Sequence, residues 1–205
     1  MTDHAQLPTR RDRYAEMTRR EIVTAARQLF AVQGYARTTV EQISRAARVS
    51  PATVYAQCGG KEGLLGTLID MWTAAQLVRD IIAACEAVDT GRAKLEVLAE
   101  GYVAIYEESG DIIRIVERAA SSVPVAEDFL KTADERHLQA VRQIVARIQD
   151  IGDLADGVSV EDAVRIIFFH FRYDQFALAA DTFGWGVDRT RRWITDRLES
   201  AILRD

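Results

Sequence analysis

A short segment near residue 50 places hydroxyl and amide side chains on one face of a predicted helix. Ser50-Pro51 is typical of a helix start, because the Ser hydroxyl accepts a backbone N–H and Pro at the first helical position has none to satisfy. Val54 is then expected to face inward, which leaves the outer positions to Ala52, Thr53, Tyr55, Ala56 and Gln57. These small and polar groups suit contacts with base edges and phosphates.

A second short helix is predicted directly before this segment. Thr38 and Glu41 have the spacing of a capping box, and Val40, Ile43 and Ala47 fall at i, i+3 and i+7. About three residues separate the two helices, so the chain must turn sharply and the helices must cross. An ordinary corner between two helices shows the same local pattern, and the flanking sequence has to decide between the two interpretations.

The preceding residues, 18–35, predict an amphipathic helix. Its apolar face comprises Ile22, Ala25, Ala26, Leu29 and Val32. Gly34 is expected to end it, as glycines do just past a helix C-terminus. Residues 1–17 are assigned to a flexible basic N-terminal arm, with its charge on Arg10, Arg11 and Arg13.

Taken together, these residues resemble the N-terminal domain of the TetR family of transcriptional regulators. The match is ordered and nearly ungapped over about 48 residues, roughly 18–65, and so covers only the first third of the chain. It is carried by Thr18-Arg19, Ile22, Ala25-Ala26, Leu29-Phe30, Gly34-Tyr35, Thr38-Thr39, Ile43, Ala47, Val49-Ser50, Thr53-Val54-Tyr55, Lys61-Glu62 and Leu64-Leu65.

The resemblance implies contacts with double-stranded DNA. Ala52 and Thr53 would approach base edges, Tyr55 and Lys61 would bind phosphates, and Gln57 could do either. Hydroxyls at the start of the preceding helix would also touch phosphate. The full predicted DNA-binding set is Arg37, Thr38, Thr39, Arg48, Ser50, Ala52, Thr53, Tyr55, Gln57 and Lys61.

Three positions depart from the family pattern. Arg48 stands where the turn usually has glycine, so a left-handed conformation there would cost on the order of 1 kcal/mol. Cys58 replaces the aromatic residue that normally closes the recognition helix onto the core. The predicted recognition helix also lacks Arg and Lys, so base readout must come from Ala, Thr and Gln, with Arg48 assisting.

The charges of the chain are divided between its two ends. Residues 1–65 hold ten Lys/Arg and six Asp/Glu, a net charge of +4, and residues 66–205 hold sixteen and twenty-five, a net charge of −9. The sum is the −5 of the whole chain. The basic end is therefore the end expected to meet nucleic acid.

The remainder of the chain, residues 66–205, predicts a helical body. Apolar residues recur at helical spacing and no alternating strand pattern occurs, so we predict an all-α fold, with the helix-turn-helix domain at 18–65 followed by a larger effector-binding and dimerisation domain. The expected helices are 61–88, 93–109, 111–120, 127–151, 160–182 and 187–203.

One of these helices is apolar on nearly its whole circumference, over residues 164–180. Such a helix must be buried on all sides, either in the centre of a monomer or between its own core and a second subunit. The resemblance favours a two-fold homodimer, which implies a palindromic operator. The predicted dimer interface comprises Phe168, Phe171, Gln175, Leu178, Trp193, Ile194 and Leu198.

The resemblance also implies a small-molecule effector held within the body. Arg172 is the best single candidate, because a guanidinium in an apolar helix needs an anion or acceptor, which could equally be Asp174 or a carboxylate across the interface. For the aromatic candidates, the competing interpretation is that they pack in the hydrophobic core, as most aromatic residues at helical spacing do. The candidate set is Trp72, Tyr102, Tyr106, Phe129, His137, Phe169, Arg172 and Tyr173.

Several classes of function are disfavoured by the sequence. No metalloprotease, nucleophile-elbow or phosphate-loop motif occurs, and the two cysteines lack metal-ligand spacing, so no enzyme activity, metal or cofactor is expected. No apolar run could span a membrane and no secretion signal is present, which predicts a cytoplasmic location. We predict a repressor that a small molecule releases from DNA. The alternatives are an effector-independent architectural DNA-binding protein or, further off, a helical small-molecule-binding protein or enzyme.

Overall fold

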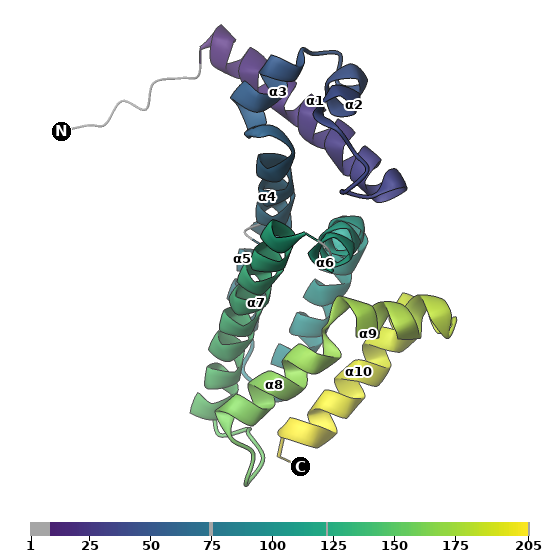
Figure 1. Cartoon of the computed structure of the whole chain (residues 1–205). Coiled ribbons are helices and arrows are strands. Elements are labelled where there is room, and N and C mark those ends of the chain that lie inside the picture. Colours follow the sequence, from purple (N-terminus) through teal and green to yellow (C-terminus); the bar gives the residue numbers. More distant parts are fainter. Residues whose placement is uncertain (1–8, 74–75, 122, 205) are drawn as a thin grey trace, which may run out of the picture. The chain divides into compact units, whose positions relative to one another are not determined.

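The computed structural model describes residues 9–73, 76–121 and 123–204, and within these ranges it is helical (Figure 1). The predicted all-α class is confirmed. Apart from helices, the described residues contain a single isolated bridge, between Leu154 and Leu203. No helix among them is both long enough and apolar enough to cross a membrane.

The chain folds as two compact units. The first contains Met1–Asp70 and Arg114–Phe129, and the second contains Met71–Ile113 and Leu130–Asp205. Three helices, α4, α6 and α7, have residues in both units. The sequence assigns residues 18–65 to one domain, and the first unit includes in addition a segment that lies far along the chain.

The N-terminal part of the first unit consists of α1 (Arg10–Gln33), α2 (Val40–Ala46), α3 (Pro51–Cys58) and the start of α4 (Gly60–Thr73). Each helix contributes an apolar stripe, and these stripes form a core in which their side chains are buried. The most deeply buried members are Ile22, Ala26, Phe30, Ile43, Val54, Leu64, Leu65 and Leu68.

The start of α1 differs from the sequence-based prediction. Residues 10–17 belong to the predicted flexible arm, yet they form the first two turns of the helix. The reason is a capping box: the Asp12 N–H donates to Thr9 Oγ1 at 3.2 Å, and the Thr9 N–H donates to Asp12 Oδ2 at 2.9 Å. The remainder of the predicted arm, residues 1–8, lies outside the described residues.

The apolar face of α1 is also corrected at one position. Val32 is predicted on the buried face but is 85% exposed, whereas Phe30 is buried. Val32 follows Ile22 by ten residues, which turns it about 80° away from Ile22 around the helix axis. Gly34 ends the helix at a φ of 84°, as predicted.

The helices of the second unit are α5 (Gln76–Glu86), α8 (Val160–His170), α9 (Tyr173–Ala177), a short π-helix η1 (Leu178–Thr182) and α10 (Gly186–Ile202), with most of α6 (Gly91–Ala120) and α7 (Pro124–Asp150). Their core is formed by aliphatic and aromatic side chains from α5 to α10, including Leu95, Tyr102, Val145, Ile148, Ile167, Phe171, Phe176, Leu198 and Ile202.

Two predicted boundaries in this unit are wrong. A break is expected at Gly110, but α6 continues through it. A Cβ at this position would lie 3.1 Å from the Tyr173 ring, so the glycine serves close packing. One helix is expected over 160–182, but α8 ends at His170 and a new helix starts at Tyr173. Whether the predicted helix 61–88 is continuous depends on residues 74–75, which lie outside the described residues.

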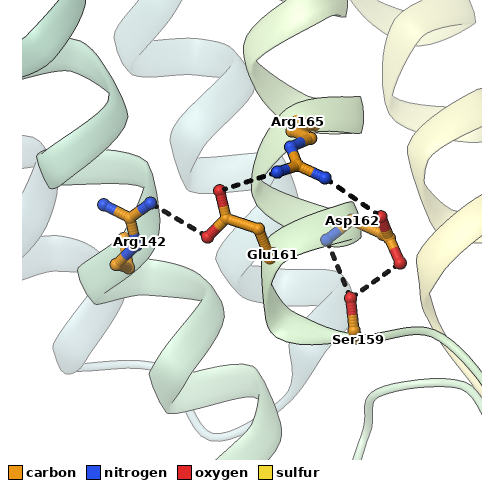
Figure 2. A network of polar contacts seen from close by, with 5 residues as sticks. All are labelled: Arg142, Ser159, Glu161, Asp162 and Arg165. Carbon is orange, nitrogen blue, oxygen red and sulfur yellow. Dashed lines mark hydrogen bonds and ion pairs between the residues drawn. The ribbon is translucent and has the colours of Figure 1, made fainter.

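The start of α8 is tied to α7 by a network of exposed polar side chains (Figure 2). Ser159 is the predicted N-cap and accepts the Asp162 N–H at 3.1 Å. Arg142 on α7 pairs with Glu161 at 3.0 Å, and Arg165 lies 3.6 Å from Glu161 and 3.7 Å from Asp162. Because these groups are all solvated, the pairs contribute less than about 1 kcal/mol each.

Candidate DNA-binding surface and helical body

The turn between α2 and α3 is built around Arg48. Its φ is +56°, the only positive value at a non-glycine position among the described residues. This confirms the left-handed conformation expected where the pattern usually has glycine. The Val49 N–H donates to Ser44 O at 2.9 Å and closes the turn, while the Arg48 side chain is exposed.

The first turn of α3 is fixed by two hydroxyl groups. Ser50 Oγ accepts the Thr53 N–H at 3.1 Å, which confirms Ser50 as the N-cap. The same Ser50 oxygen lies 2.8 Å from Thr53 Oγ1, so the two hydroxyls hydrogen-bond to each other. Val54 is fully buried beneath them. The helix is therefore anchored on its inner side, and Ala52 stays on its exposed outer side.

Tyr55 presents its ring on the outer side of α3. It is 60% exposed, and the ring rests against the turn that leads into α4. A Cβ at Gly60 would lie 2.7 Å from Tyr55 Cε1, and Gly60 also has a φ of +74°. Glycine at this position therefore leaves room for the ring, whose hydroxyl is of the type that donates to a phosphate oxygen. Gln57 is half-buried on the same helix.

Lys61 occupies a different place from the one expected of a phosphate ligand. Its Nζ donates to Tyr35 O and to Thr38 O, both at 2.9 Å, and lies 4.4 Å from the centre of the Tyr35 ring. Desolvation lowers the pKa of this ammonium group. Lys61 thus ties α4 to the connection between α1 and α2, and its donors are directed at main-chain carbonyls.

The two threonines at the start of α2 have different roles. Thr38 is 1% exposed, and its hydroxyl donates to Gly34 O at 2.8 Å, so it is not a surface phosphate ligand. Thr39 is the actual N-cap, with Gln42 in place of Glu41 as its capping-box partner. Thr39 is exposed, as is Arg37, whose Nε donates to Gln33 O at 2.7 Å.

In the second unit, four of the predicted effector-binding residues belong to one aromatic cluster. Tyr102 lies 4.8 Å from Phe171 and 5.4 Å from Phe176, and Tyr106 lies 4.7 Å from Phe176 and 5.2 Å from Tyr173, measured between ring centres. His137 faces Tyr102 at 6.5 Å. Phe171 and Phe176 belong to the same cluster but are absent from the predicted effector-binding set. An apolar pattern in the sequence predicts that a ring is buried, but it does not predict which other rings it will contact.

Arg172 has a carboxylate partner that the sequence did not identify. Its Nη1 lies 3.0 Å from both oxygens of Asp134, and its Nε lies 3.7 Å from Asp174. The guanidinium also lies 5.6 Å from the centre of the Phe168 ring. Burial, together with the neighbouring Arg172 charge, lowers the pKa of His137 to about 4. The imidazole is therefore neutral at pH 7 and offers an acceptor nitrogen.

The other effector candidates lie elsewhere. Phe169 is 57% exposed. Phe129 belongs to the first unit, where its ring packs near Gly66. Trp72 is half-buried at the end of α4, and no ring contact joins it to the aromatic cluster among the described residues.

The predicted dimer interface is corrected at three positions, and a fourth, Phe168, is half-buried. Phe171, Ile194 and Leu198 are at most 3% exposed and belong to the protomer's own core. Phe168 packs 5.0 Å from His137. The helix period places these residues correctly on an apolar face but cannot say which apolar face is the outer one.

The exposed apolar residues of α8 to α10 coincide with the predicted interface only in part. We call it the aromatic strip, defined as Phe169, Leu178, Phe183, Trp185 and Trp193. Four of its members are more than 40% exposed, and Trp185 lies between two of them, 5.9 Å from Phe183 and 5.6 Å from Trp193. Gln175 is exposed as well. Leu178, Trp193 and Gln175 are thus the three predicted interface residues that are exposed on the protomer.

The caps, the sharp turn between α2 and α3 and the exposed outer side of α3 are the features of a helix-turn-helix domain. Residues 22–68 match the family model described as "Bacterial regulatory proteins, tetR family". Over these residues the chain is similar to the TetR family, and it is a DNA-binding transcriptional regulator.

Relatives and solved structures extend the likeness beyond this domain. The HTH-type transcriptional regulator TcmR of Streptomyces glaucescens is 28% identical over 171 residues, which are 77% of this chain and 69% of TcmR. SmeT, the repressor of the Stenotrophomonas maltophilia efflux pump SmeDEF, has the same fold in its triclosan complex, with a TM-score of 0.79, 19% identity and coverage of 92% and 93%. NalD of Pseudomonas aeruginosa gives a TM-score of 0.77, 19% identity and coverage of 94% and 99%.

Proposed function

We propose that this regulator is a homodimeric repressor that binds a palindromic operator and leaves it when a small molecule binds. The observation that carries the proposal is α3, whose inner side is anchored by Val54 and the Ser50 cap while Thr53 and Tyr55 stay accessible. A compact dimer on a palindrome blocks transcription by occupying the promoter. Because its target is chromosomal DNA, we place its action in the cytoplasm.

The aromatic strip supports the dimer. Exposed aromatic side chains that contact one another form an apolar patch that a monomer in water would not favour, and such patches mark interfaces. A two-fold axis through this surface would pair the strip with its own copy. Two α3 helices would then face half-sites about one turn of DNA apart.

The aromatic cluster supports an effector. It combines flat apolar walls with a neutral imidazole and a guanidinium–carboxylate pair, the composition typical of small-molecule sites. Arg172 and Asp134 come from different helices, so a ligand that displaced one partner would alter the packing of α7 against the start of α9. SmeT, which shares the fold, has been solved with triclosan, an observation that concerns SmeT itself.

The effector-independent alternative is favoured by the close packing of the same rings, whose centres lie 4.7 to 5.4 Å apart within the cluster. On that alternative the second unit is filled by its own side chains. Operator binding would then respond to no small molecule.

Binding to genomic DNA fragments, followed by sequencing, tests the first part of the proposal. We expect enrichment of an inverted repeat. Titration with triclosan, compared between the native chain and Arg172→Gln, then tests the second part: the native complex should dissociate and the variant should need a higher concentration. DNA release that is identical in both proteins would exclude Arg172 from the effector site.

Analytical ultracentrifugation tests the dimer. The native protein should sediment as a dimer at micromolar concentration, and Trp193→Ser should shift it towards monomer. Arg192→Ser, an exposed position on α10 about 100° around the helix axis from Trp193, is the matched control. A native monomer would refute both the dimer and the palindrome.

A further inference from the structure

We propose that the first turns of α1 form a second DNA-binding element, which contacts the phosphate backbone beside each half-site. We call residues 10–20 the α1 extension. The inference rests on the DNA-binding function proposed above and adds a surface outside the helix-turn-helix. Its partner is the backbone of double-stranded DNA, recognised through charge.

The helix-turn-helix itself offers few cations to DNA. α3 has neither Lys nor Arg, and most basic side chains around it are already engaged within the protein. Arg19 donates to Gln57 O, Arg37 to Gln33 O and Lys61 to Tyr35 O, while Arg27 also has a partner. From residue 18 to residue 65, only Arg45 and Arg48 make no side-chain hydrogen bond or ion pair with another described residue.

The α1 extension supplies the missing charge. Arg10, Arg11 and Arg13 are exposed, and none forms an ion pair with another described residue. Arg10, Arg13 and Met17 share one face at i, i+3 and i+7. Tyr14 is 72% and Met17 59% exposed, so this part of α1 buries little against its own domain.

Arg19 fixes where the α1 extension lies. Its Nη1 donates to Gln57 O at 2.7 Å, in the last turn of α3, and its Nη2 to Thr67 Oγ1 at 3.3 Å in α4. Figure 1 shows the first turns of α1 running past α3. Arg10 precedes Arg19 by nine residues, so the helix reaches about 14 Å beyond this contact. The recognition helix and the three free arginines therefore belong to one rigid arrangement.

The helical conformation selects the kind of contact. A flexible arm can enter the minor groove, but an α-helix is about 10–12 Å across and the groove about 6 Å wide. Because the major groove of the half-site is assigned to α3, the α1 extension is placed on the backbone. Tyr14 adds a hydroxyl, and the arginines add guanidinium groups, which bind phosphate oxygens in pairs.

The salt dependence of operator binding tests the proposal. In Arg10→Gln/Arg11→Gln/Arg13→Gln, the slope of log K against log salt should fall in magnitude by about 0.9 for each phosphate that is no longer neutralised, or by up to about 5 for six arginines in a dimer. Affinity should fall at least about tenfold at 0.1 M salt. Arg142→Gln/Arg147→Gln/Arg165→Gln, in the second unit, removes the same net charge and should leave the slope unchanged.

Two further measurements separate the role of the helix from that of the charge. Ala15→Pro keeps all three arginines but breaks the α1 extension, and it should lose most of the affinity that the triple variant loses. Shortening the DNA on either side of the operator should weaken DNA binding by the native protein but not by the triple variant. Circular dichroism checks that each variant is folded.

The outcomes distinguish this inference from the proposed function. If the native protein binds no inverted repeat, the proposed function fails. If it binds one and the triple variant keeps the native slope, only the α1 extension is refuted. A native affinity in Ala15→Pro would show that the arginines act without the helix and would overturn the backbone contact argued here.

Discussion

Arg48→Gly should make the protein more stable and a weaker DNA binder. A non-glycine residue in the left-handed region costs about 1–2 kcal/mol, and Arg48 adopts it at a φ of +56°. Glycine relieves that strain, but its greater freedom in the unfolded chain costs about 0.5–1 kcal/mol. The net gain is therefore about 0.5 kcal/mol, or roughly 1–2 °C in Tm for a chain of this size.

The weaker DNA binding follows from charge. Arg48 is exposed beside the start of α3 and makes no ion pair with another described residue. If each protomer of the variant neutralises one phosphate fewer, the salt slope should fall by about 1.8 for the dimer, and affinity at 0.1 M salt by about tenfold. Thermal unfolding measures the first effect, and fluorescence anisotropy on the operator across a salt series measures the second.

Arg48→Ala provides the control. Alanine removes the charge but keeps a Cβ in the left-handed region, so it should weaken binding as glycine does without raising Tm. If Arg48→Gly binds the operator with native affinity, the arginine side chain makes no contribution to DNA binding. A lowered Tm in Arg48→Gly would refute the argument from strain.

Three other predictions follow from the described contacts. Lys61→Met should lower stability by about 1–3 kcal/mol, because Tyr35 O and Thr38 O lose their donor; a native Tm with weakened DNA binding would restore the phosphate role. The folded protein holds the pKa of His137 at about 4 against 6.5, so stability should decline as pH falls from about 6.5 towards 4, and urea titrations of His137→Gln should show less of this decline. Tyr55→Phe should weaken binding equally on all sequences, whereas Thr53→Ala should change sequence preference; a uniform loss in both, measured on a panel of operator variants, would contradict the assignment of Thr53 to base edges.

The DNA-binding domain was largely predictable from the sequence because its signals are local. Ser50, Pro51 and Gly59 mark the ends of α3 through backbone chemistry that acts within a few residues, and the structure has all three as expected. The N-cap of α2 shows the limit of such local signals, because the sequence predicts Thr38 and the structure has Thr39. Both are threonines with an acceptor three residues on, and only the buried hydrogen bond from Thr38 to Gly34 O decides between them.

For residues 66–205 the sequence predicts the helices, but it does not predict how they pack against one another. Arg172 was expected to need an anion, yet Asp134 lies 38 residues away and no local pattern connects them. Phe169 and Phe171 are only two residues apart, and one is 57% exposed while the other is 1% exposed. When a helix is apolar on every side, its period carries no information about which side faces its neighbours.

The π-helix η1 has a consequence for how this protein can vary. A π-turn holds one residue more than an α-turn, so it stores an insertion that the helices around it have absorbed. Deleting a residue there would convert the turn to ordinary helix and leave the orientation of the residues that follow unchanged. η1 is thus the place at which a related chain could be one residue shorter while Phe183 and Trp193 keep their orientation.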